Sequence, residues 1–230
     1  MTQIQSFAEL VPRFEAEPPQ VIFFDAMGTL FGLRGSVGDI YGKIAQSFGV
    51  QVNSAQLNQA FFDSFKNAPP LAFGESDPIL LADLEYEWWY AIASQAFSQI
   101  EALEKFDDFD QFFQTLYEHF ASEEPWFVYA DVMPILKDWQ QQGIQLGVIS
   151  NFDSRLNQVL THLELINFFN QIIYSSRYKI AKPDPRIFQF ALDKFNCLPS
   201  QAWHIGDSLR EDYNGANTLG IKAFLIQRSD

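Results

Sequence analysis

The fold is decided by one stretch of the chain, VIFFDAMGTL at residues 21–30. Its first four residues are all apolar, and the run stops at Asp25, with Gly28 shortly after it. An uninterrupted apolar run of this length is typical of a parallel strand that is buried on both faces. We therefore predict a central strand at residues 21–24 that presents Asp25 at its carboxyl end.

Four further apolar runs follow much later in the chain, with amphipathic helical patterns between them. They lie at residues 144–149, 171–174, 202–205 and 221–226. Pro185 is placed to open one of these helices, and Gly143 to follow the end of another. Asp153 or Ser154 is expected to cap the helix that begins near Leu156. Strands that alternate with helices predict an α/β fold with a Rossmann-like, doubly wound parallel sheet.

Between residues 36 and 125 the pattern changes to one helix after another. Ser36 is placed to cap the first helix, and Asp77-Pro78 opens the third. Large apolar and aromatic side chains recur at helical spacing through the whole segment. We predict a helical domain at residues 36–125, inserted into a core domain made of residues 1–35 and 126–230.

The composition excludes several classes of protein. The 230 residues include 15 basic and 29 acidic side chains, a net charge of −14, so a nucleic-acid partner is not expected. The 47% of hydrophobic residues provides a real core and excludes disorder, and the single cysteine, Cys197, excludes an internal disulfide. No apolar run approaches the 18 or so residues of a membrane span, and we expect a cytoplasmic protein. The oligomeric state cannot be inferred from these features.

Polar residues gather where the predicted strands end. They are Asp25, Ser150, Asn151, Asp207 and Asp212. Ligands of open α/β sheets bind beyond the carboxyl ends of the strands, and Lys182, just before a helix, should lie near the same edge. Such a set can hold a hard cation through carboxylate oxygens, and a phosphate through lysine, hydroxyl and backbone N–H groups. His204 lies inside a strand and is expected to be a buried structural residue.

These residues resemble the four motifs of the haloacid dehalogenase (HAD) superfamily of hydrolases. The matching segments are DAMGTL at 25–30, VISN at 148–151, KPDP at 182–185, and GDS at 206–208 followed by Asp212. Each motif is weak alone, but the four occur in the family's order and at predicted strand ends. The helical segment after the first motif is similar to the family's C1 cap, which closes over the site and selects the substrate.

The resemblance implies a phosphatase that acts on a small phosphorylated metabolite with Mg²⁺ as cofactor. Asp25 would be the nucleophile that forms an aspartyl-phosphate, and Lys182 the second catalytic residue. Three groups would hold Mg²⁺: the carboxylates of Asp25 and Asp207, and the backbone carbonyl of Met27. The remaining matched positions have binding or supporting roles: Ser150, with Lys182, for the phosphoryl oxygens, Thr29 and Asn151 for the substrate, and Asp212 to orient Lys182 or a metal-bound water.

Met27 departs from the family pattern, because family phosphatases carry there a second Asp that protonates the leaving oxygen and activates water. A thioether can do neither, and such acid–base catalysis is typically worth about 10²–10⁴-fold. Three alternatives stay open: a slow phosphatase, a weak or inactive phosphate- and metal-binding regulatory protein, or another HAD chemistry. The dehalogenase type is disfavoured by the acidic fourth motif. The phosphonatase type needs a cap lysine, for which Lys43 and Lys66 are candidates.

Overall fold

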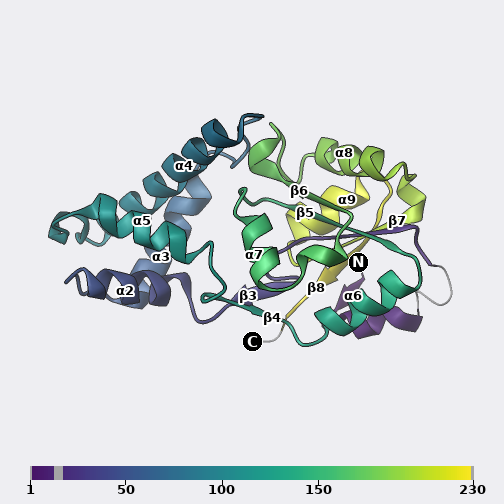
Figure 1. Cartoon of the computed structure of the whole chain (residues 1–230), viewed down its shortest axis with the longest axis horizontal. Coiled ribbons are helices and arrows are strands. Elements are labelled where there is room, and N and C mark those ends of the chain that lie inside the picture. The colour runs from purple at the N-terminus through teal and green to yellow at the C-terminus, as the bar shows by residue number, and fades with distance from the viewer. Residues whose placement is uncertain (1, 13–17, 229–230) are drawn as a thin grey trace.

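The computed structural model describes residues 2–12 and 18–228, and it places an α/β core beside a unit of helices (Figure 1). Within these residues, six parallel strands form one sheet in the order β1-β8-β7-β2-β5-β6. The strands are β1 (Gln3–Ile4), β2 (Val21–Phe24), β5 (Gln145–Ser150), β6 (Gln171–Tyr174), β7 (Ala202–Gly206) and β8 (Lys222–Ile226). The flanking helices are η1 (Phe7–Leu10), α6 (Val132–Gln141), α7 (Leu156–His162), α8 (Pro185–Phe195) and α9 (Gly215–Asn217).

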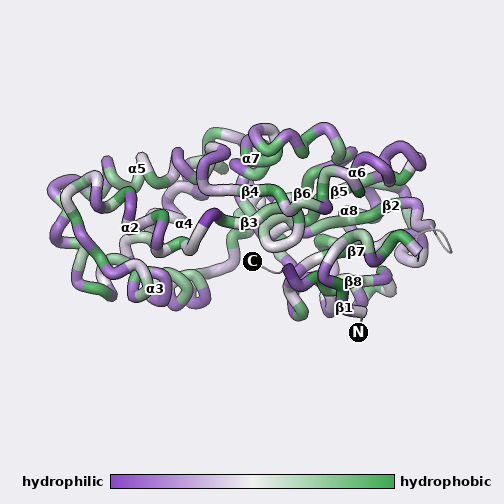
Figure 2. Tube along the Cα trace, turned by 90° about the horizontal axis from the view of Figure 1, so that it is seen from below, coloured by the Kyte–Doolittle hydropathy of each residue, from purple (hydrophilic) through white to green (hydrophobic). Residues whose placement is uncertain are grey.

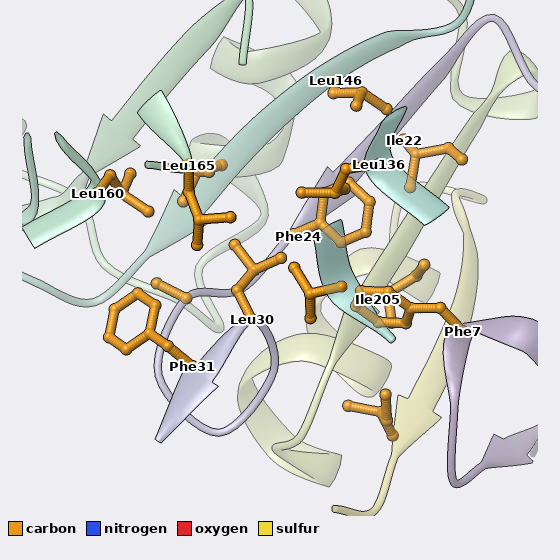
Figure 3. Packing of buried hydrophobic residues seen from close by; sticks show 14 of the residues in the cluster. Phe7, Ile22, Phe24, Leu30, Phe31, Leu136, Leu146, Leu160, Leu165 and Ile205 are labelled. Atoms are coloured by element: carbon orange, nitrogen blue, oxygen red, sulfur yellow. The ribbon is translucent and has the colours of Figure 1, made fainter. Parts of the chain in front are cut away.

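Helices cover both faces of the sheet. Ile22 and Phe24 belong to the hydrophobic cluster between the sheet and η1, α6 and α7 (Figure 3). Val21 and Phe23 belong to the cluster on the other face, against α8 and α9. Strand β2 is thus buried on both faces, which is why its sequence is apolar without alternation. The predicted doubly wound α/β fold is confirmed.

Two pieces of β-structure were not predicted from the sequence. Strand β1 is the edge strand beside β8, and it is only two residues long. Strands β3 (Phe31–Leu33) and β4 (Trp126–Val128) form an antiparallel pair where the chain leaves the core and where it returns. Segments this short contain too few residues to show a period, so the pattern of residues gives no strand signal.

The helical unit lies at the opposite end of the molecule from β7 and α8 (Figure 1). Its helices are α2 (Val37–Ser47), α3 (Ser54–Asn67), α4 (Pro78–Gln99), η2 (Leu103–Lys105) and α5 (Phe109–His119). They share a hydrophobic cluster of their own, rich in aromatic side chains. Ser36 and Asp77 cap α2 and α4 as predicted. None of the described helices is long and apolar enough to cross a membrane.

The expected cap of α7 is wrong. The residue at the N-cap position is Arg155, which makes no side-chain capping bond, and neither Asp153 nor Ser154 caps the helix. Both side chains bond to α4 instead: Asp153 Oδ2 accepts from Trp89 Nε1 at 2.7 Å, and the Ser154 hydroxyl bonds to Glu85. Asp153 Oδ1 also accepts from Arg155 N at 2.9 Å, so this carboxylate joins its own turn to a segment more than 60 residues away along the chain.

Figure 2 shows the sheet and the helical unit side by side in a second view. Besides the β3–β4 pair, the two parts are joined by polar contacts around the end of β6. Ser175 Oγ donates to the Leu71 carbonyl at 2.6 Å, and the Ser176 carbonyl accepts from Phe73 N at 3.0 Å. The buried Glu85 carboxylate of α4 accepts from Ser154 N at 2.9 Å and from Ser176 Oγ at 2.5 Å. The helical unit is thus anchored to the core at several points distant in sequence.

Candidate active site

The strand order brings the predicted site residues to one edge of the sheet. β2 lies between β5 and β7, and Phe24 at its end pairs with Val148 and with Ile205. The carboxyl ends of three neighbouring strands therefore present Asp25, the residues from Ser150 onward, and Asp207. Parallel strands in register place residues that are far apart in sequence within reach of one another.

Lys182 lies at the centre of this site. Its Nζ donates to Asp25 Oδ1 and to Asp212 Oδ1, both at 2.6 Å, and all three side chains are buried. Burial lowers the pKa of Lys182, but the charges of Asp212 and Asp25 outweigh it and raise this pKa above its usual range. Burial has the opposite effect on Asp212 and raises its pKa, but the Lys182 charge and the His204 hydrogen bond outweigh burial and hold this pKa low. Lys182 is therefore an ammonium fixed between carboxylates.

Asp207 completes a cluster that is suited to a cation. Asp25, Asp207 and Asp212 each offer a carboxylate oxygen, and these oxygens lie within 4.8 Å of one another. The surrounding protein and the charges of Asp25 and Asp212 raise the pKa of Asp207 to about 7. When Asp207 is ionised, three carboxylates face one ammonium, and a divalent cation would neutralise the excess negative charge and favour this ionised form. Oxygen ligands of this kind fit Mg²⁺, and Asp25 and Asp207 are the residues that would hold it.

Two glycines allow the close approach of backbone and carboxylates in this cluster. A Cβ on Gly28, whose φ is +80°, would lie 2.5 Å from Asp207 Oδ2. A Cβ on Gly206 would lie 2.2 Å from Asp212 Cγ. Only residues without a side chain fit at these two positions, so the sequence around both motifs is constrained by the packing of the site.

The loop after β2 holds the other residues of the first motif. The Met27 side chain is 41% exposed, so it contributes an apolar surface at the position where family phosphatases carry a proton donor. Thr29 is fully buried, its hydroxyl has no hydrogen-bond partner among the described residues, and its carbonyl accepts from Arg228 Nη2 at 2.6 Å. Its substrate-binding role stays a prediction. Ser150 is buried at the end of β5.

Asn151 contacts protein groups on both ends of its amide. Its Oδ1 accepts from Lys182 N at 2.8 Å, and its Nδ2 donates to the Lys182 carbonyl at 2.9 Å and to Glu211 Oε2 at 3.0 Å. The substrate contact that the sequence predicted for Asn151 stays a prediction; in the structure its amide is bound to the loop that carries Lys182. Glu211 was not predicted at all, although its place directly before Asp212 was a signal.

His204 was expected to be a buried structural residue, and its side chain is fully buried. Its Nε2 lies 2.9 Å from Asp212 Oδ1, the oxygen that also accepts from Lys182. The Ser208 N–H donates to the other oxygen of Asp212 at 3.0 Å. Asp212 is therefore held by three groups, and His204 belongs to the support of the site.

A doubly wound sheet with three carboxylates and a buried lysine at its carboxyl edge, and with helices inserted after the central strand, defines the HAD-like class of hydrolases. Residues 19–220 match the family model of the haloacid dehalogenase-like hydrolases, and the chain belongs to this family. It is 33% identical to haloacid dehalogenase-like hydrolase domain-containing protein 3 of Danio rerio, over 93% of this chain and 87% of the relative. The human protein of the same name is 30% identical, over 90% and 81%.

Solved structures show the same fold at lower identity. A dehalogenase with an intermediate complex has a TM-score of 0.68 at 18% identity, covering 93% of this chain and 87% of that chain. A putative beta-phosphoglucomutase from Thermotoga maritima has a TM-score of 0.66 at 20% identity, covering 89% and 83%. The names of these two neighbours refer to different chemistries on one fold, so function has to be argued from the site.

Proposed function

We propose that this hydrolase is a Mg²⁺-dependent phosphatase that acts on a small phosphorylated metabolite, with Asp25 as the nucleophile and the helical unit as a cap over the site. One observation carries the proposal: the Lys182 ammonium lies 2.6 Å from Asp25, beside two further carboxylates. A dehalogenase has no need of this acidic cluster. A phosphoryl group needs both the positive charge and a cation to offset the charge of the attacking carboxylate.

In the proposed reaction an Asp25 oxygen attacks phosphorus, and the bond between phosphorus and the leaving oxygen breaks. The product is an aspartyl-phosphate on Asp25 and a free alcohol or phenol. Lys182 and the Ser150 hydroxyl bind phosphoryl oxygens, and Mg²⁺ held by Asp25 and Asp207 would supply Lewis-acid stabilisation. Water then attacks phosphorus, which releases inorganic phosphate and restores the Asp25 carboxylate.

Met27 limits this reaction in a defined way. It cannot protonate a leaving alkoxide or deprotonate the attacking water, so both protons must move to or from solvent or substrate. The proposed enzyme is therefore slow on alkyl phosphates and less impaired on phosphates of acidic phenols. The alternative with most support from Met27 is a regulatory protein that binds phosphate and metal without turnover. Lys43 and Lys66, the two candidates for the cap lysine that a phosphonatase needs, are both exposed.

Rapid mixing with p-nitrophenyl phosphate and Mg²⁺ tests the proposal. Because p-nitrophenolate leaves as a stable anion, the first step needs no general acid. We expect a burst of about one equivalent of p-nitrophenol followed by slow turnover, with the burst abolished by EDTA and in Asp25→Asn. A trace that does not exceed the Asp25→Asn control would refute the phosphatase and favour the binding protein.

A further inference from the structure

The backbone of Lys182 is held by a single side chain. Lys182 lies in an irregular segment between β6 and α8, outside any strand or helix. The Asn151 amide accepts from its N–H and donates to its carbonyl, at 2.8 and 2.9 Å, as a neighbouring strand would. The position of the Lys182 ammonium between Asp25 and Asp212 therefore depends on the orientation of the Asn151 amide.

Glu211 fixes that orientation. Its Oε2 accepts the other Nδ2 proton of Asn151 at 3.0 Å, and only the amide nitrogen can donate to a carboxylate. This bond favours the same amide orientation that the Lys182 N–H and carbonyl require, and it holds the amide in place between them. Rotating the amide by half a turn would leave both backbone groups of Lys182 facing groups of their own kind.

A widened helical turn brings Glu211 and Asp212 to the same site. Residues Leu209–Asn214 form a π-helical turn, η6, in which Tyr213 N donates to the Ser208 carbonyl five residues earlier. Such turns are rare in proteins, and those that occur are often found at functional sites. Two consecutive carboxylates therefore act on Lys182. Asp212 accepts from the Lys182 ammonium, and Glu211 contacts the Asn151 amide that holds the Lys182 backbone.

We propose that Glu211 is a positioning residue, which acts through the Asn151 amide to fix the backbone of Lys182 and so keeps its ammonium between Asp25 and Asp212. Its importance for catalysis rests on the proposed function, whereas its effect on Lys182 can be measured without any activity. The bond between Asn151 and Glu211 is partly buried, and a hydrogen bond to a charged group is worth enough to change a local opening equilibrium by about tenfold.

Amide hydrogen exchange of Lys182, followed by NMR in the full chain, measures the effect on the backbone. We expect exchange of this amide to become about tenfold faster in Glu211→Ala and to stay near the wild-type rate in Glu211→Gln, whose amide oxygen still accepts. In the Asn151→Ala background, Glu211→Ala should add nothing further. Arg210→Ala, an exposed neighbour on the same turn, is the matched control, and amides of β2 report on any general loss of stability.

The burst experiment gives the second measurement. We expect the burst rate constant to fall in Glu211→Ala, with the KM for p-nitrophenyl phosphate less affected, and to recover in Glu211→Gln. Equal loss in Glu211→Gln and Glu211→Ala would overturn the proposal, because the charge itself would then be required. Unchanged Lys182 exchange in Glu211→Ala, or an undiminished effect in the Asn151→Ala background, would overturn it as well. Should the wild type give no burst, the phosphatase fails and the exchange rates alone decide the role of Glu211.

Discussion

Replacing Asp153 by alanine should destabilise the protein strongly, because it leaves a buried guanidinium without its counter-ion. Asp153 is fully buried and accepts from Arg155 Nη2 at 2.6 Å, from Arg155 Nε at 3.0 Å and from Trp89 Nε1 at 2.7 Å. After the substitution, the contacts left to Arg155 among the described residues are the Tyr117 carbonyl at 3.0 Å and the faces of two aromatic rings. Breaking the network also removes one of the links between α4 and the core.

The size of the effect follows from the burial of the pair. Removing one partner of a buried ion pair typically costs about 3–5 kcal/mol, since the remaining charge stays desolvated. Glu85 offsets part of this cost. Burial is the larger cause of its raised pKa and the Asp153 charge is the second, so the substitution removes a repulsion between the two carboxylates. For a chain of this size, 3–5 kcal/mol corresponds to a fall in Tm of about 6–20 °C.

Urea unfolding followed by far-UV circular dichroism measures the loss, and tryptophan fluorescence shows whether both parts of the molecule unfold together. The chain offers a matched control in Asp184→Ala. Asp184 and Arg186 form an aspartate–arginine pair with the same spacing and the same 2.6 Å contact, but it lies at the surface. Asp184 also caps α8, so we expect a loss of about 0.5–2 kcal/mol there, most of it from the cap and little from the exposed ion pair. Equal losses in the two variants would refute the argument from burial.

Three further results are expected. Met27→Asp should raise the turnover of an alkyl phosphate by about 10²–10⁴-fold in a phosphate-release assay, and an unchanged rate would mean that another group already moves the proton. Gly28→Ala should weaken Mg²⁺ binding at least about tenfold by calorimetry, because the new methyl displaces Asp207; unaltered affinity would argue against Asp207 as a ligand. Burial raises the pKa of Asp131, but hydrogen bonds from Phe7 N, Ser6 and Arg228 outweigh burial and lower this pKa overall. The ionised Asp131 therefore stabilises the fold above a pH of about 4, and this stabilisation is lost at lower pH. Asp131→Asn should therefore cost stability in urea at pH 7 and progressively less toward pH 2, whereas a cost independent of pH would exclude this origin.

Most of the fold and much of the candidate site could be predicted because the relevant signals are local. The observed bounds of β2 and β6 coincide with the predicted runs. β2 has to be apolar along its whole length because both of its faces are buried, whereas in the edge strand β6 only the last two residues are buried. Asp25 and Asp207 could be placed at one edge for the same reason: each follows a buried strand, and parallel strands end together. Ser36 and Asp77 were found as helix caps because a cap bonds to the backbone only a few residues away.

The sequence by itself therefore determined the parallel sheet, the inserted helices and the set of residues at the carboxyl edge. Only the tertiary structure decided how these side chains are used. Asp153 has the chemistry of a helix cap, but folding buries it against Trp89 of α4 and the guanidinium of its neighbour Arg155, where burial strengthens charged contacts. Asn151 and Glu211 act on Lys182 through contacts that span tens of residues. Such partnerships depend on distances set by packing, and packing is a property of the whole chain rather than of any segment.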